Sequence, residues 1–126
     1  MVVGIGLDLV ELERIQRLDE RSDAFRLRIL TPCEQSKYES LQSSRRRLEF
    51  LAGRFAAKED FSKALGTGIG AKCTFQQIEV LNDASGRPFL RFSEEDVAGF
   101  VSITHTEQVA AAQVVLIEWP ACWKDE

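Results

Sequence analysis

Residues 44–65 carry the pattern that most restricts the fold of this chain. Large apolar side chains recur there, mostly at three- and four-residue steps and with alanines between them: Leu48, Leu51, Phe55, Phe61 and Leu65. This spacing places the side chains on one face of a helix. Gly66 follows directly, and glycine is common just past the end of a helix. We therefore predict one long helix whose apolar stripe must be covered by other elements.

The segments around this helix have apolar spacings of their own. Residues 2–10 alternate and predict a strand, whereas residues 11–30 repeat with helical spacing up to Thr31-Pro32, which ends one helix and begins the next. After the long helix we predict a short helical turn at 93–97, a turn at 82–86, and strands at 75–81, 87–92, 100–106 and 109–117. This order predicts an α+β fold in which the long helix packs on an antiparallel sheet.

Length and composition limit the class of protein further. The 126 residues fit a single domain, 1–126, with a frayed tail at 119–126. No apolar run approaches the roughly 20 residues of a membrane helix, and the first residues show no secretion signal, so we expect a cytoplasmic protein away from membranes. Three widely spaced cysteines fit a reducing compartment. The net charge of −4 gives no reason to expect nucleic acid as a partner.

Asp8 interrupts the apolar pattern of the first strand. It shares a strand face with Gly4 and Gly6, which leave room for a ligand or another backbone to come close. Because an unpaired buried carboxylate is costly, Asp8 must face water, pair with a cation or bind a metal. The residue alone leaves these alternatives open.

Glu59 and Lys63 lie four residues apart at the edge of the long helix's apolar stripe. A surface ion pair is one interpretation, because Glu before Lys at this spacing is the favoured order. The functional interpretation is a metal-binding Glu59 and a phosphate-binding Lys63. Two carboxylates from distant segments, with water and phosphate completing the shell, is a common way to hold Mg²⁺.

The loop after the long helix and the single histidine are further candidates. Gly66, Gly68 and Gly70 give a loop whose backbone N–H groups suit phosphate, or a plain helix cap and turn. The loop follows its helix, so it is not a Walker loop. His105 shares a predicted strand face with Val101 and Ile103, which favours a packed or partly buried side chain over a zinc ligand.

Two runs of arginine mark candidate partner surfaces. Arg14, Arg17 and Arg21 belong to the first run, in the helix predicted at 11–30, and the second run, Arg45–Arg47, opens the long helix. Such runs are either solvated helix faces or docking surfaces for an acidic partner. Positive charge is unfavourable at a helix start, so local stability does not explain the second run.

Three blocks taken together resemble the holo-acyl-carrier-protein synthase family of 4′-phosphopantetheinyl transferases. The blocks are GIGLDLVELERI at 4–15, GRFAAKEDFSKALGTGIG at 53–70 and VSITHT at 101–106. Their order and spacing match the family along nearly the whole chain, to about Glu118. Asp60 is a departure, because the family tends to have smaller residues there.

The resemblance implies a Mg²⁺-dependent transferase of fatty acid biosynthesis. Such an enzyme moves 4′-phosphopantetheine from coenzyme A to a serine of apo acyl carrier protein and releases adenosine 3′,5′-bisphosphate. Asp8 and Glu59 would bind Mg²⁺, and Lys63 would contact the phosphates. The residues implied to line the coenzyme A site are Gly66, Gly68, Gly70, His105 and Thr106.

The resemblance also implies partners and assembly. Arg14, Arg17 and Arg21 would dock the acidic helix of the carrier protein, and the chain would form a homotrimer with active sites between subunits. Two alternatives remain from the sequence. One is a non-catalytic member that only binds coenzyme A or the carrier protein. The other is an interaction domain whose arginine face binds an acidic partner.

Overall fold

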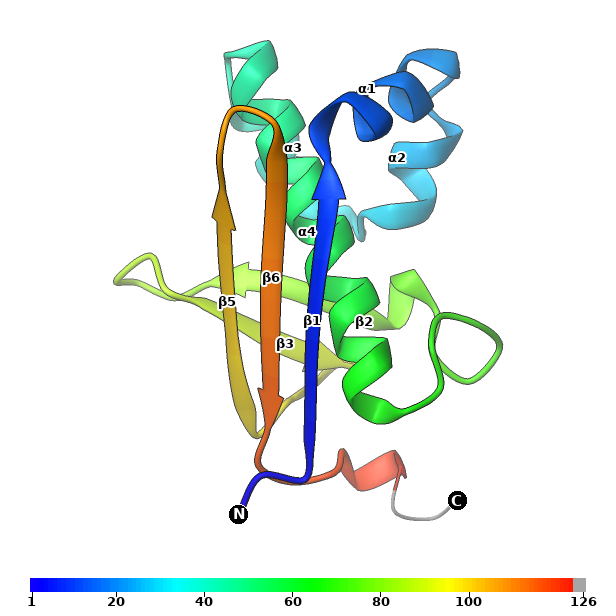
Figure 1. Ribbon diagram of the computed structural model, residues 1–126, viewed down its shortest axis with the longest axis vertical. Coiled ribbons are helices and arrows are strands. Elements are labelled where there is room, and N and C mark those ends of the chain that lie inside the picture. The colour runs from blue at the N-terminus through cyan, green and yellow to red at the C-terminus, as the bar shows by residue number, and fades with distance from the viewer. Residues whose placement is uncertain (124–126) are drawn as a thin grey trace.

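The computed structural model describes residues 1–123 as an α+β fold built around one long helix (Figure 1). The α-helices are α1 (Leu12–Arg21), α2 (Ala24–Ile29), α3 (Pro32–Ser40) and α4 (Ser44–Leu65), with two short 3₁₀ helices, η1 (Phe75–Gln77) and η2 (Ala121–Trp123). The strands are β1 (Gly4–Glu11), β2 (Ile78–Asn82), β3 (Pro88–Phe92), β4 (Glu95–Asp96), β5 (Gly99–His105) and β6 (Val109–Leu116).

The predicted long helix is confirmed as α4, and an antiparallel sheet of order β1-β6-β5 covers one side of it. The second sheet, β2-β3-β4, crosses behind the first, and α1 to α3 gather near the start of α4 (Figure 1). Between Leu51 and Leu65, Glu59 and Lys63 are the only residues that are not buried. This part of the helix is therefore enclosed except at the two positions that the sequence marks as functional.

Two glycines let β1 approach α4 closely. A Cβ atom on Gly4 would overlap the carbonyl oxygen of Ala64, and one on Gly6 would overlap Asp60. Any other residue there would push the strand off the helix. The alternation of β1 then places Asp8, two residues beyond Gly6, on the same face toward α4.

The opposite face of this sheet is exposed and apolar. Ile5, Leu7 and Leu9 of β1 are each more than 60% exposed, and Phe100 of β5 is 59% exposed. The register aligns Ile5 and Phe100 with Val115 of the central strand, so these side chains form one continuous patch. Apolar patches of this kind mark surfaces that other molecules cover.

A buried ion pair joins the small helices to α4. Lys58 Nζ lies 2.6 Å from Glu34 Oε1, and both side chains are fully buried. Lys58 also donates to the carbonyl oxygens of Ile29 and Phe75, while Glu34 accepts from the backbone N–H of Val80. One pair of charges thus connects α2, α3, α4, η1 and β2.

Three local predictions were wrong. The helix predicted at 11–30 is two helices, because the chain is extended at Ser22. The strand predicted at 75–81 begins as η1, which Thr74 and Gln77 hold in a capping box. The helical turn predicted at 93–97 is a tight turn with positive φ at Ser93 and Glu94, followed by β4.

The structure describes the tail predicted at 119–126 as far as Trp123. Trp119 and Trp123 pack against the core, and Trp123 meets the ring of Phe92 edge-on at 6.4 Å. Residues 124–126 lie outside the described residues. The two large aromatic side chains bury enough apolar surface to hold this segment on the fold.

Candidate active site

Asp8, Glu59 and Lys63 come together where β1 crosses α4. Lys63 Nζ donates to Asp8 Oδ1 at 2.7 Å, and the Asp8 side chain is 18% exposed. Of the alternatives for Asp8, the structure therefore shows pairing with a cation. Glu59 lies one helical turn before Lys63 on the same face of α4.

The site carries more negative than positive charge. Burial, followed by the nearby charge of Asp8, raises the pKa of Glu59. The hydrogen bond to Asp8 is the main cause that raises the pKa of Lys63, which keeps its ammonium charged. Two carboxylates that each disfavour the charge of the other are an arrangement that a cation would relieve.

Asp60 is a third acid at this position, and its burial was not predicted. Its side chain is fully buried against Gly6. Within residues 1–123 neither carboxylate oxygen has a partner at normal hydrogen-bond geometry, and the Val114 backbone has the smallest of the effects on its pKa. Burial, with a smaller contribution from the charge of Asp8, raises the pKa of Asp60 to about 7. The one sequence feature that could have indicated this burial is the position of Asp60 within the apolar stripe of the long helix.

The donor set fits Mg²⁺ rather than a soft metal. Two carboxylates supply the hard oxygen ligands that Mg²⁺ prefers, and Mg²⁺ commonly keeps waters and phosphate oxygens for its other positions. No group of three or more His, Cys, Asp or Glu side chains suited to a metal occurs among residues 1–123. Asp8 and Glu59 could therefore supply only part of a metal shell, which a ligand would have to complete.

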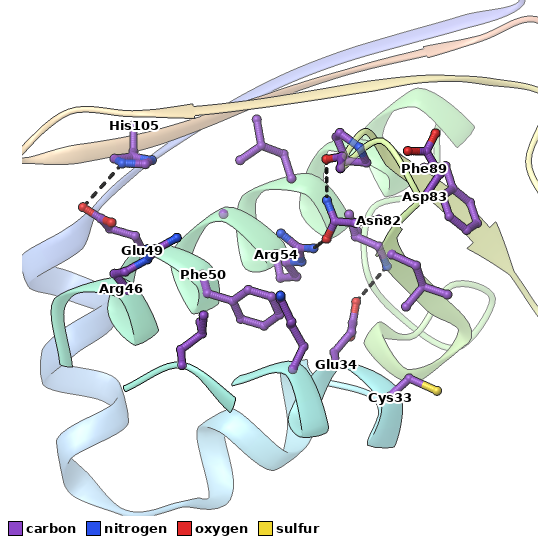
Figure 2. Close-up of a pocket in the computed structure, with 18 of the residues that line it drawn as sticks. Cys33, Glu34, Arg46, Glu49, Phe50, Arg54, Asn82, Asp83, Phe89 and His105 are labelled. Carbon is purple, nitrogen blue, oxygen red and sulfur yellow. Dashed lines mark hydrogen bonds and ion pairs between the residues drawn. The ribbon is translucent and has the colours of Figure 1, made fainter. Parts of the chain in front are cut away.

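A separate pocket of about 930 Å³ opens between α3, the first half of α4, the β2–β3 turn and β5 (Figure 2). Its lining includes the cations Lys37, Arg46 and Arg54. The Arg54 guanidinium stacks on the Phe50 ring at 4.2 Å and donates to Asn82 Oδ1 at 2.8 Å. Sequence reasoning did not identify Arg54 or Asn82, because they join only when the β2–β3 turn folds over α4.

His105 lies at the edge of this pocket and points toward Glu49 (Figure 2). Its side chain is 49% exposed, so of the packed or partly buried histidine expected from the sequence, the structure has a ring that is only partly covered. Thr106 begins the following turn, where its Oγ1 accepts from the backbone N–H groups of Gln108 and Val109. Both residues therefore belong to the tip of the β5–β6 hairpin.

The glycine loop lies at the other end of α4. Gly66 ends the helix with φ of 91°, as predicted for a helix cap, and Gly68 and Gly70 follow in the loop. Glu49, which contacts His105, lies about 25 Å from Gly66 along the helix axis, from the helical rise per residue. Within one chain, His105 and Thr106 are thus not brought together with the loop.

The first arginine run forms an exposed surface next to the acidic site. Arg14, Arg17 and Arg21 of α1 are all exposed, and Arg17 pairs with Glu13. The charge of Arg14 lowers the pKa of Glu59, against the larger effect of burial, so Arg14 lies close to the candidate site. None of the helices within residues 1–123 combines the length and apolar character needed to cross a membrane.

Comparisons with known proteins agree with this architecture. The chain matches the family model of the 4′-phosphopantetheinyl transferase superfamily over residues 4–115. It is 53% identical to the holo-acyl-carrier-protein synthase of Staphylococcus carnosus and 54% identical to that of Bacillus velezensis, covering 92% of this chain and 97% and 96% of those proteins.

A solved structure gives the same result in three dimensions. The crystal structure of a Bacillus anthracis holo-acyl-carrier-protein synthase, in complex with coenzyme A (3′,5′-ADP), is 47% identical with a TM-score of 0.80, and the match covers 92% of this chain and 96% of that one. The fold, the sequence blocks and these matches lead to one conclusion. The chain belongs to the 4′-phosphopantetheinyl transferase superfamily, in its holo-acyl-carrier-protein synthase family.

Proposed function

We propose that this chain transfers 4′-phosphopantetheine from coenzyme A to a serine of apo acyl carrier protein, for fatty acid biosynthesis. The serine oxygen forms a bond to the phosphorus that carries pantetheine, and the pyrophosphate bond breaks to release adenosine 3′,5′-bisphosphate. The observation that carries the proposal is the meeting of Asp8, Glu59 and Lys63 at the β1–α4 crossing. Membership of the holo-acyl-carrier-protein synthase family identifies the reaction.

Asp8 and Glu59 are proposed to hold Mg²⁺. When bound, Mg²⁺ would neutralise the pyrophosphate and polarise it toward attack. Lys63 is half exposed and charged, so it can leave Asp8 and contact the leaving phosphate. Phosphoryl transfer needs positioning and charge neutralisation more than a protein nucleophile, which fits these three residues.

The 930 Å³ pocket is proposed to receive the adenosine bisphosphate part of coenzyme A. Arg46 and Arg54 supply positive charge, and His105 lies at its edge. Phe50 provides an aromatic ring beside Arg54, and the volume falls within the range of ligand sites. The Gly66–Gly70 loop, with Gly68 at its centre, is proposed to meet phosphate oxygens through its backbone N–H groups.

A homotrimer with shared sites is proposed to complete this arrangement. The exposed apolar patch of Ile5, Leu7, Leu9 and Phe100 needs a covering surface, and a second copy of the chain would supply one. A neighbouring copy would also bring its own His105 pocket to the acidic site, since the glycine loop and His105 of one chain lie far apart. The coenzyme A site would then draw residues from two chains.

The exposed arginines Arg14, Arg17 and Arg21 are proposed to dock the acidic helix of the carrier protein. Because the charge of Arg14 reaches Glu59, docking there would bring the carrier serine toward the acidic site. We place the reaction in the cytoplasm. Free thiols at Cys33, Cys73 and Cys122 support a reducing compartment.

Mass spectrometry of apo carrier protein tests the function. Incubation with the purified chain, coenzyme A and Mg²⁺ should add one phosphopantetheine to the carrier serine, and EDTA should abolish the gain. A carrier in which that serine is alanine is the matched control. Carrier binding with no gain of mass would overturn the proposal and favour a non-catalytic binding module.

A further inference from the structure

Glu49 is one of three acids, with Glu34 and Asp83, in the pocket that also holds the cations proposed to bind phosphate. It lines the pocket together with Lys37, Arg46 and Arg54, and its side chain is only 21% exposed. A phosphate group that entered this pocket would be repelled by Glu49. The presence of this acid therefore needs a reason other than direct contact with an anionic ligand.

The contacts of Glu49 supply that reason. Its Oε2 lies 3.4 Å from His105 Nε2 and 3.0 Å from Arg45 Nε (Figure 2 shows the first of these contacts). Arg45 in turn donates through Nη2 to the main-chain oxygens of Glu107 at 2.6 Å and Thr106 at 3.3 Å. Arg45 and Glu49 thus connect the first turns of α4 to the tip of the β5–β6 hairpin.

His105 needs such a partner because packing does not fix its ring. The side chain is half exposed at the end of β5. A carboxylate 3.4 Å from Nε2 restrains the rotation of the ring and favours a hydrogen on that nitrogen, which leaves Nδ1 to meet a ligand. Glu49 contacts the ring and is itself paired with Arg45. The other charged residues that line the pocket are Glu34, Lys37, Arg46, Arg54 and Asp83.

We infer that Glu49 is a positioning residue that orients His105 toward a phosphate group of the ligand. The inference rests on the proposed function, in which this pocket receives the adenosine bisphosphate part of coenzyme A. Glu49 itself does not touch the ligand. Its effect on binding passes through His105, so it must disappear when His105 is absent.

A double-mutant cycle tests this dependence. We measure the dissociation constant of adenosine 3′,5′-bisphosphate by calorimetry for the unaltered chain, Glu49→Ala, His105→Ala and the double variant. His105→Ala should weaken binding about tenfold, as expected for a hydrogen bond to a charged group. Glu49→Ala should weaken it by about three- to tenfold, and adding Glu49→Ala to His105→Ala should cause no further loss.

The direction in which Glu49→Ala changes the dissociation constant distinguishes orientation of His105 from simple repulsion of phosphate. If Glu49 only repelled phosphate, its removal would tighten binding, and that result would overturn the inference. An equal loss with and without His105 would overturn it as well. Glu107→Ala removes the same charge two residues along the chain from His105 without touching the ring contact, and it should not weaken binding. Glu49→Gln keeps an acceptor at this position and should recover part of the loss.

Spectroscopy of the free protein gives a reading that needs neither ligand nor activity. His105 is the only histidine, so its two ring nitrogens give unambiguous ¹⁵N signals. Glu49→Ala should shift the Nε2 signal more than the Nδ1 signal, and unchanged signals would contradict the orientation by Glu49. Failure to form holo carrier protein would overturn the proposed function but would leave this result standing.

Discussion

At the scale of single residues, three carboxylates and one ammonium meet where β1 crosses α4. Asp8, Glu59 and Lys63 remain within reach of solvent, whereas Asp60 is fully buried behind them. Burial raises the pKa of Asp60 to about 7, so this side chain is largely neutral below that pH. The small size of Gly6 makes the space that Asp60 occupies.

Asp60 should make the stability of the metal-free chain fall with rising pH. The folded chain keeps this proton up to about pH 7, whereas the unfolded chain loses it near 3.8, the ordinary pKa of an aspartate. Raising the pH across that window therefore lowers the free energy of unfolding. In urea denaturation with EDTA, the advantage of Asp60→Asn over the unaltered chain should grow from about pH 4 to 7 and then level off. A difference independent of pH would contradict this account.

The residue types of the site could be recognised from the sequence, but their contacts could not. Asp8 and Glu59 were each compatible with an ordinary surface acid. Their meeting depends on β1 and α4, which are far apart in sequence and come close because of Gly4 and Gly6. The pairing of Lys63 with Asp8 likewise crosses 55 residues. No local pattern carries that information.

At the scale of elements, the buried pair of Glu34 and Lys58 fixes how the small helices lie on α4. Lys58 has three acceptors and Glu34 accepts from Val80, so these charges are well compensated. Removing one partner leaves an uncompensated buried charge, which is far more costly than removing both.

Glu34→Ala should therefore lower the free energy of unfolding by about 3 to 5 kcal/mol, measured by urea denaturation. Replacing both partners, as Glu34→Leu with Lys58→Met, should cost clearly less than this single change. Glu39→Ala, an exposed acid of the same helix, is the control and should change stability little. A double variant less stable than Glu34→Ala would argue against the pair as the source of the loss.

Helices and strands with long, regular apolar patterns were predicted correctly. Short segments whose conformation depends on local contacts were not. The long helix and the β5–β6 hairpin were confirmed. The turn at Ser93 and Glu94 was missed, because its positive φ values are set by pairing between β3 and β4. The capping box of Thr74 and Gln77 similarly replaces the start of a strand with a 3₁₀ turn.

At the scale of the whole molecule, the apolar patch on the β1-β6-β5 sheet is the most informative surface. The alternation of β1 was read correctly as one solid apolar face, but that face is exposed in the single chain, while the glycine face packs on α4. A sequence pattern shows that a face must be covered without showing what covers it. A second copy of the chain is the proposed cover.

Leu7→Arg should break this assembly, because it places a charge at the centre of the patch. Size-exclusion chromatography with light scattering should show a trimer for the unaltered chain and a monomer for the variant. Leu27→Arg changes an exposed leucine of α2, which lies outside the patch, and should remain trimeric. Trimers of Leu7→Arg would contradict the proposed interface.

Shared active sites can be tested separately by mixing two variants of reduced activity and measuring the activity gained above that of each variant alone. Asp8→Asn keeps the His105 pocket, and His105→Ala keeps the carboxylates. If sites form between chains, random trimers of both should recover about a quarter of the unaltered activity, because one interface in four is intact. If each site lies within one chain, mixing after dissociation and reassembly should restore nothing.

The most direct test of the central claim is the Mg²⁺ dependence of holo carrier formation in Asp8→Asn and Glu59→Gln. Because the metal supplies several kcal/mol of charge stabilisation, we predict that each variant loses about 100-fold or more in rate and needs more Mg²⁺. Glu95→Gln, an exposed acid far from the site in sequence, should match the unaltered chain. Unchanged rates and Mg²⁺ dependence in both carboxylate variants would contradict the account.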